Sequence, residues 1–135
     1  MTRITALLGA TASIAAAAAI AVAAATAATG PARGHRVAPP PQVTRACELW
    51  RGLGWPATER PMTYQVPGGY LRGGNTFGDR EGHLPSSGAY HEYDVNPRPA
   101  PQTHRDAERL VRDGDTTQTW YSLDHYRTFH SAPGC

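Results

Sequence analysis

The amino-acid sequence predicts an α+β fold: a small single domain with a twisted antiparallel sheet and a reduced helical region at its N-terminal end. From Gly73 onward, short segments rich in aromatic and β-branched residues alternate with clusters of Gly, Pro, Asp and Ser, which is typical of strands joined by turns. Upstream, a helical pattern near Ala46 soon meets glycines and prolines. The 135-residue chain is long enough for one such domain and no more.

Residues 1–28 have the composition of a secretory signal peptide. They contain a single Arg, no acidic residue and a long Ala-rich run that ends in small residues. A membrane anchor is the alternative, but an Ala-dominated run is only weakly hydrophobic and lacks a basic stop-transfer flank. We therefore expect a secreted, extracellular protein that has no stable association with the membrane once the signal is removed.

Residues 29–43 are expected to form a Pro-rich leader or linker, since they hold four of the twelve prolines and few apolar side chains. The folded domain is expected to span residues 44–135, which contain neither an internal repeat nor a second linker. Without the signal, the net charge of the chain is about +1, so bulk charge does not indicate nucleic-acid binding. Any phosphate recognition must come from a local cluster.

The distribution of turn residues predicts the individual elements. Residues 46–64 begin like a helix, but Gly52, Gly54, Pro56 and Pro61 leave room for only short helical turns. Strands and their connecting turns are then expected in the segments GGNTFGDREGHLP, YHEYDV, RLV, QTWYSL and YRTF. Neighbours of this kind, joined by short turns, favour an antiparallel sheet.

The segment YHEYDV places a carboxylate where a strand is expected. A period of two puts Tyr90, Glu92 and Asp94 on one face of the sheet, and Tyr93 and Val95 on the other. A carboxylate between aromatic residues is poorly placed for stability, because desolvation penalises its charged form unless a nearby group compensates it. Glu92 therefore calls for an explanation beyond the fold.

Cys47 and Cys135 are the only cysteines, and they lie at the two ends of the expected domain. In an oxidising compartment we expect them to form a disulfide, with two free thiols as the disfavoured alternative. Closing so long a loop contributes about 4 to 5 kcal/mol in the chain-entropy model. Two cysteines also disfavour a cysteine-based zinc site.

Several side chains have the chemistry that metal-free RNA cleavage requires. A base must take the 2′-hydroxyl proton, an acid must protonate the leaving 5′-oxygen, and guanidinium groups must hold the phosphoryl oxygens. Taken singly, each candidate has a plain structural explanation: Arg105 and Arg109 can be a solvated face, and His125 can be a structural histidine held by Asp124. The candidates are Glu92, His125, Arg80, Arg105, Arg109 and Glu81.

The order of these residues resembles a known family. GGNTFGDREGHLP, then YHEY, then R-x-x-x-R-L-V and finally DHYRTF occur in the order seen in the small secreted guanyl-specific bacterial ribonucleases, the family of barnase. The terminal cysteine pair is similar to that of the disulfide-containing actinomycete branch. This resemblance implies the microbial ribonuclease fold. It also implies a metal-independent endoribonuclease without cofactors, which cleaves single-stranded RNA after guanosine through a 2′,3′-cyclic phosphate.

The resemblance also implies a role for each matching residue. Glu92 corresponds to the general base and His125 to the general acid. Guanine recognition falls to Glu81, whose carboxylate can accept the N1–H and N2–H donors of guanine as a pair. Arg80, Arg105 and Arg109 correspond to a phosphate-binding cluster. The Tyr126 hydroxyl is expected close to the same phosphate, and Phe77 is expected to support the base or stack on it.

The sequence departs from the family pattern at two places. Asp79 stands where the family usually has Asn, and it adds a negative charge beside the guanine site, so Asp79→Asn is expected to raise cleavage after G. Pro56 and Pro61 interrupt a segment that is normally an amphipathic helix. A catalytically weak or inactive relative, binding RNA or a protein partner, is therefore the alternative function.

A monomer is expected, with a small acidic protein inhibitor as a potential second partner. A metal-dependent nuclease is disfavoured, because the six histidines are scattered without paired-ligand spacing.

Overall fold

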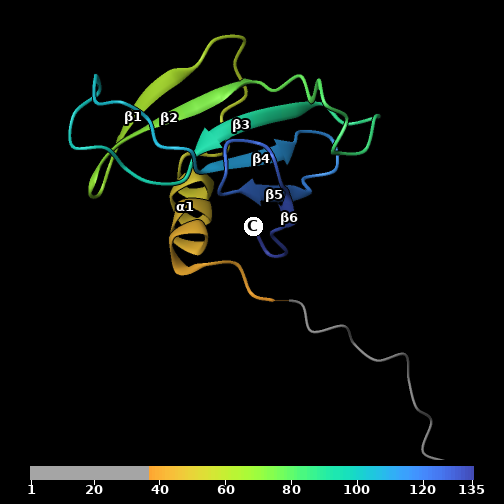
Figure 1. Cartoon of the computed structure of the whole chain (residues 1–135). Helices are drawn as coiled ribbons and strands as arrows, with labels where there is room; N and C mark the ends of the chain where they lie inside the picture. Colours follow the sequence, from red (N-terminus) through yellow and green to blue (C-terminus); the bar gives the residue numbers. More distant parts are fainter. Residues whose placement is uncertain (1–36) are drawn as a thin grey trace, which may run out of the picture. The chain divides into compact units, whose positions relative to one another are not determined.

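The computed structural model describes residues 37–135, which form one helix and a six-stranded sheet (Figure 1). The predicted signal peptide and most of the predicted leader lie outside the described residues. The strand order β1-β2-β3-β4-β5-β6 follows the sequence, and every neighbouring pair is antiparallel. The predicted α+β fold is therefore confirmed. The elements are α1 (Pro41–Gly52), β1 (Met62–Val66), β2 (Gly69–Thr76), β3 (Tyr90–Asp94), β4 (Arg109–Asp113), β5 (Thr119–Ser122) and β6 (His130–Ser131).

Helix α1 is longer than the sequence analysis predicts. It begins at Pro41, within the expected leader, because proline is well tolerated in a first turn whose N–H groups have no helical partner. It ends at Gly52, and Gly54 follows with a left-handed φ of 76°. The glycines therefore end the helix, as expected. The prediction of only short helical turns from Ala46 is wrong at the N-terminal end.

The hairpin of β1 and β2 is missing from the sequence analysis, which expects strands only from Gly73 onward. Val66 pairs with Gly69, so Pro67 and Gly68 form a two-residue loop, and Gly68 has the positive φ of 93° that the second position of a type II turn requires. Three glycines in β2 weaken its strand pattern, and the pairing with β1 outweighs this low propensity. At Gly74, with a φ of 93°, the register of β2 against β3 shifts.

The predicted strand YRTF is also wrong. The chain turns there, with left-handed φ values of 57° at His125 and 68° at Tyr126, and pairing resumes only at His130. Because residues 125–129 are not paired in the sheet, their side chains do not follow the alternation of a strand.

The two faces of the sheet carry separate apolar clusters. Tyr93 and Val95 belong to the cluster that packs against α1, which lies on one face of the sheet (Figure 1). Tyr90, Val111 and Trp120 form the core of the other cluster, together with Leu84. This division confirms the period of two predicted for YHEYDV. It also places Glu92 on the face that α1 leaves uncovered.

The predicted disulfide between Cys47 and Cys135 is present, with a Cα–Cα distance of 5.2 Å across 88 positions of sequence. It joins α1 to the segment after β6 and belongs to the cluster beneath the helix. Within the described residues, no helix is both long and apolar enough to cross a membrane.

Candidate active site

A cavity of about 410 Å³ opens on the face that carries Glu92; we call it the Glu92 cavity. Two loops contribute most of its lining, residues 77–83 after β2 and residues 125–127 before β6, and β3 contributes Glu92. The lining residues are Thr76, Phe77, Gly78, Asp79, Arg80, Glu81, His83, Glu92, His125, Tyr126 and Arg127.

Asp79 organises the first of these loops. Its φ of 42° is left-handed, a region that Asp tolerates better than most residues. Its two carboxylate oxygens accept the backbone N–H groups of His83 and Leu84, both at 3.0 Å, and its carbonyl accepts the N–H of Gly82 at 2.9 Å. Both oxygens of Asp79 are thus engaged inside the loop. Glu81, by contrast, is exposed at the cavity wall.

Glu92 accepts hydrogen bonds on both carboxylate oxygens. The Tyr126 hydroxyl donates to Oε2 at 2.6 Å, and Arg105 Nη1 donates to Oε1 at 3.4 Å. Burial and the Glu92 carboxylate together raise the pKa of Tyr126, so that this hydroxyl remains a donor at neutral pH. The Tyr126 ring stacks on Phe77 at 4.9 Å between centroids. The Glu92 side chain is only 13 % exposed, and its carboxylate is compensated by a phenol and a guanidinium group.

Asp94, two positions along β3, holds the arginines together. Its side chain is only 4 % exposed, and Oδ1 accepts a hydrogen bond from Arg105 Nε at 2.6 Å. It also forms ion pairs with Arg98 at 3.6 Å and Arg109 at 3.7 Å. Burial opposes the charged form of Arg105, but Asp94 and Glu92 outweigh it and the pKa of Arg105 is raised. Since Arg109 is 4 % exposed, the alternative of a solvated arginine face is wrong.

His125 lies on an exposed, left-handed turn, and its backbone N–H donates to the carbonyl of Ala107. The alternative in which Asp124 holds the imidazole is not what the structure shows. The Asp124 carboxylate instead accepts bonds from Thr128, Ser122 and the N–H of Arg127, and the Thr128 hydroxyl is the main cause that lowers the pKa of Asp124 to about 2. Among the described residues, none forms a hydrogen bond with the His125 ring.

Comparison with known proteins identifies the family. A family model described as ribonuclease matches residues 13–133 of the chain. The chain belongs to the ribonuclease family. This membership confirms the resemblance to the microbial ribonucleases and implies RNA as the class of substrate.

Individual ribonucleases match over part of the chain. A ribonuclease of Heyndrickxia coagulans is 37 % identical over 79 residues, which cover 57 % of this chain and 68 % of that protein. A ribonuclease of Bacillus intermedius is also 37 % identical over 79 residues, covering 57 % of this chain and 46 % of the relative. The guanyl-specific ribonuclease Sa3 of Kitasatospora aureofaciens is 39 % identical over 62 residues, covering 44 % of this chain and 43 % of its own. No solved structure matches significantly.

The residues predicted from the ribonuclease resemblance fall into two adjoining groups. Arg105 and Arg109 line a second, larger cavity, which we call the arginine cavity, and His125 lines both. The ion pair between Arg105 and Glu92 links the two groups. The predicted residues that line the Glu92 cavity are Phe77, Arg80, Glu81, Glu92, His125 and Tyr126. Arg80 is therefore not in the same cavity as the other two predicted phosphate-binding arginines.

Sequence reasoning assigns no role to Asp94, Arg98 or Arg72. A signal for Asp94 was present, because the period of two already places it on the face of Glu92. Arg98 and Arg72 are brought to the arginine cavity by a loop and a neighbouring strand, so nothing in their local sequence marks them. Within residues 37–135, no group of three or more His, Cys, Asp or Glu side chains is arranged to hold a metal ion.

Proposed function

We propose that this ribonuclease is a secreted endoribonuclease that cleaves single-stranded RNA after guanosine without a metal ion. One observation supports this proposal above all. Glu92, His125 and Glu81 line the same cavity, and Glu92 forms an ion pair with Arg105 of the neighbouring arginine cluster. A base, an acid and a guanine acceptor within one cavity are the groups that such a reaction needs. The name of one relative, a guanyl-specific ribonuclease, supports the same specificity.

In the proposed reaction, Glu92 accepts the proton of the 2′-hydroxyl as that oxygen attacks the phosphorus. The bond from phosphorus to the 5′-oxygen breaks, and His125 donates a proton to this leaving oxygen. A 2′,3′-cyclic phosphate remains and is then hydrolysed to a 3′-phosphate, with the two residues exchanging roles. Arginine N–H groups beside Glu92 stabilise the charge that develops on the phosphoryl oxygens.

Specificity for guanine is assigned to Glu81. Its exposed carboxylate can accept from N1–H and N2–H at once, whereas adenine offers no such pair of donors. Phe77, already stacked on Tyr126, supplies an aromatic surface beside the cavity. RNA is selected over DNA because the 2′-hydroxyl is itself the nucleophile.

Secretion is supported by the disulfide and by the signal-peptide pattern of residues 1–28. We further propose that the mature protein acts as a monomer. We also propose a small acidic protein as an inhibitor, because Arg80 and Arg127 are exposed at the wall of the Glu92 cavity.

The decisive experiment is digestion of one defined RNA in excess EDTA, with cleavage after G and after A measured separately. Glu81→Ala should reduce the ratio of G-site to A-site cleavage, at a cost of about 1 to 3 kcal/mol in discrimination. Arg105→Ala should slow all sites together and leave the ratio unchanged, because a phosphate contact is common to every nucleotide. An unchanged ratio in Glu81→Ala would place guanine recognition elsewhere.

The same assay tests the catalytic pair. Glu92→Gln is expected to slow cleavage by about two to four orders of magnitude, and His125→Ala should remove cleavage while RNA binding is retained. RNA binding without cleavage by the unaltered protein would instead support the alternative, an inactive relative. A requirement for a divalent metal would contradict the proposed mechanism.

A further inference from the structure

The turn that carries His125 has an uncommon backbone for residues with side chains of this size. We call it the His125 turn; it consists of residues 123–128, between β5 and β6. His125 and Tyr126 both have a left-handed φ, of 57° and 68°. For a bulky side chain such as that of Tyr126, this conformation is a clear outlier. Two such residues in succession persist only where the surrounding structure holds them in place.

Four consecutive backbone N–H groups of the turn, those of residues 125–128, each have an acceptor. The N–H of Tyr126 donates to Ser122 Oγ at 2.8 Å. The N–H groups of the next two residues donate to Asp124 Oδ1, at 3.1 and 2.9 Å. The first of the four donates to the carbonyl of Ala107 at 3.1 Å. The left-handed conformation is therefore held by hydrogen bonds to its own backbone.

Ser122 connects these hydrogen bonds to the sheet. It is the last residue of β5, it is completely buried, and it pairs with Arg109 of β4. Its Oγ accepts from the N–H of Tyr126, while its hydroxyl hydrogen is donated to Asp124 Oδ1 at 2.9 Å. A hydroxyl group can donate and accept at the same time. One buried hydroxyl thus fixes the His125 turn relative to the strand that carries Arg109.

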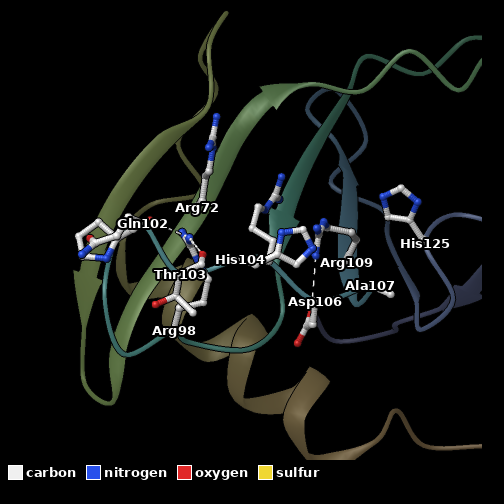
Figure 2. A pocket seen from close by; sticks show the side chains of 11 residues that line it. Arg72, Arg98, Gln102, Thr103, His104, Asp106, Ala107, Arg109 and His125 are labelled. Carbon is white, nitrogen blue, oxygen red and sulfur yellow. Dashed lines mark hydrogen bonds and ion pairs between the residues drawn. The ribbon is translucent and has the colours of Figure 1, made fainter.

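The imidazole of His125 depends on this backbone more than the neighbouring phenol does. Its side chain is exposed, and its ring forms no hydrogen bond within the described part of the chain. Figure 2 shows His125 at the edge of the arginine cavity, with its ring pointing away from Ala107. The ring of Tyr126, by contrast, stacks on Phe77, and its hydroxyl donates to Glu92. Loosening of the turn would therefore displace the imidazole before it displaces the phenol.

We propose that Ser122 is the positioning residue of the general acid. Its hydroxyl holds the His125 turn in the left-handed conformation and so places the imidazole beside the leaving 5′-oxygen. Because Ser122 is completely buried, it acts through the turn and not by contact with RNA. The inference rests on the proposed function, since only that function makes His125 an acid.

Two substrates with different leaving groups separate the placement of the acid from general damage to the fold. In GpA the bond from phosphorus to a ribose 5′-oxygen breaks, and that oxygen needs a proton from the acid. Guanosine 3′-(4-nitrophenyl phosphate) gives the same 2′,3′-cyclic phosphate when its 2′-oxygen displaces nitrophenolate, an anion that leaves without a proton. Both reactions need Glu92 to accept the 2′-hydroxyl proton. Only the cleavage of GpA needs His125.

The measured quantity is the ratio of the GpA rate to the nitrophenyl ester rate. Ser122→Ala should slow GpA cleavage by about tenfold and change ester cleavage by less than about twofold, because a displaced acid matters only for the first substrate. His125→Ala is the reference for complete loss of the acid and should lower the ratio further. All rates are measured below the melting transition of each variant, so that only folded protein is compared.

Thr119→Val is the matched control, because it removes a buried hydroxyl from the same strand. The Thr119 hydroxyl donates to the carbonyl of Thr117 and accepts from Arg112 Nη1. An odd number of positions separates it from Ser122, so the two side chains lie on opposite faces of the sheet. This variant should lose stability and keep the wild-type ratio.

Thr128→Val loosens the same network from an exposed position, since the Thr128 hydroxyl donates to Asp124 Oδ2 at 2.6 Å. It provides the test if Ser122→Ala does not fold, and its ratio should fall by about two- to threefold. Equal slowing of both substrates in the folded variants, or an unchanged ratio, would overturn the proposal. Failure of the proposed function has a different signature, because the ratio would then be unchanged in His125→Ala itself.

Discussion

At the scale of single residues, Asp94 explains how so many arginines can be buried beside a carboxylate. It contacts Arg98, Arg105 and Arg109, and it is itself almost completely buried. Burying a charged group costs desolvation free energy, and only the attraction to an oppositely charged partner offsets this cost. The arginine cluster and Asp94 are therefore one unit, and Glu92 joins it through Arg105.

Removing the charge of Asp94 should therefore destabilise the whole domain. We expect Asp94→Asn to lower the free energy of unfolding by about 3 kcal/mol or more, because buried guanidinium groups lose their counter-ion. Urea-induced unfolding measures the change. Asp115→Asn is the control, since Asp115 is an exposed carboxylate outside the cluster, and it should change stability by no more than about 0.5 kcal/mol. Equal effects of the two substitutions would contradict the assignment.

At the scale of elements, the loop from Phe77 to Leu84 depends on both oxygens of Asp79. The family pattern leads to the expectation that Asp79→Asn raises cleavage after G by removing a charge. The hydrogen bonds of Asp79 favour the opposite prediction. In Asn, one of the two oxygen positions becomes an NH2 group, which is a donor and cannot accept the N–H that this position accepts in Asp79.

We therefore predict that Asp79→Asn weakens binding of guanosine 3′-phosphate by about fivefold or more, because a loop N–H loses its acceptor. Titration of wild type and variant with this nucleotide measures the effect. Adenosine 3′-phosphate provides the comparison, since adenine lacks the paired donors that we propose Glu81 accepts. Tighter binding of the guanosine nucleotide by the variant would restore the view that the charge of Asp79 hinders the site.

Asp124, in the turn between β5 and β6, should make the stability of the domain depend on pH in acid. Asp124 accepts hydrogen bonds chiefly from Thr128, which lower its pKa from an ordinary 3.8 to about 2 in the folded protein. A depressed pKa means that the carboxylate stabilises the fold fully above about pH 4. This contribution is lost as the pH falls through about 2.

Asp124→Asn should thus lower the melting temperature at about pH 6, and the difference from wild type should shrink as the pH approaches 2. Thermal unfolding over this pH range measures both proteins. Asp115→Asn again serves as the control, because its carboxylate makes no hydrogen bond within the described residues. A difference that is constant between pH 6 and about pH 2 would exclude Asp124 as the titrating group.

At the scale of the whole molecule, one covalent bond joins the beginning of the described domain to its end. Reduction of Cys47–Cys135 should lower the free energy of unfolding by about 4 to 5 kcal/mol, because the bond closes a loop of 88 positions. Oxidised and reduced forms of the same chain are compared by urea unfolding, so no atom of the core is removed. A difference below about 1 kcal/mol would contradict this account.

The disulfide and the Glu92 cavity are associated with opposite faces of the sheet, since Cys47 packs beneath α1 and Tyr126 packs in the other cluster. At temperatures where the reduced protein is still folded, its RNA cleavage should therefore match that of the oxidised protein. A parallel loss of activity and stability below the melting transition would show that the two faces are coupled.

The sequence by itself determined the features that depend on local pattern and on residue type. The alternation in YHEYDV assigned Glu92 and Tyr93 to opposite faces, because a strand has a strict period of two. The two cysteines allowed only one intramolecular pairing, and the ordered motifs identified the family. Only the tertiary structure decided which arginines share a cavity. Arg72 and Arg98 meet beside Asp94 because a hairpin and a long loop converge there, and such contacts between distant segments leave no local signal.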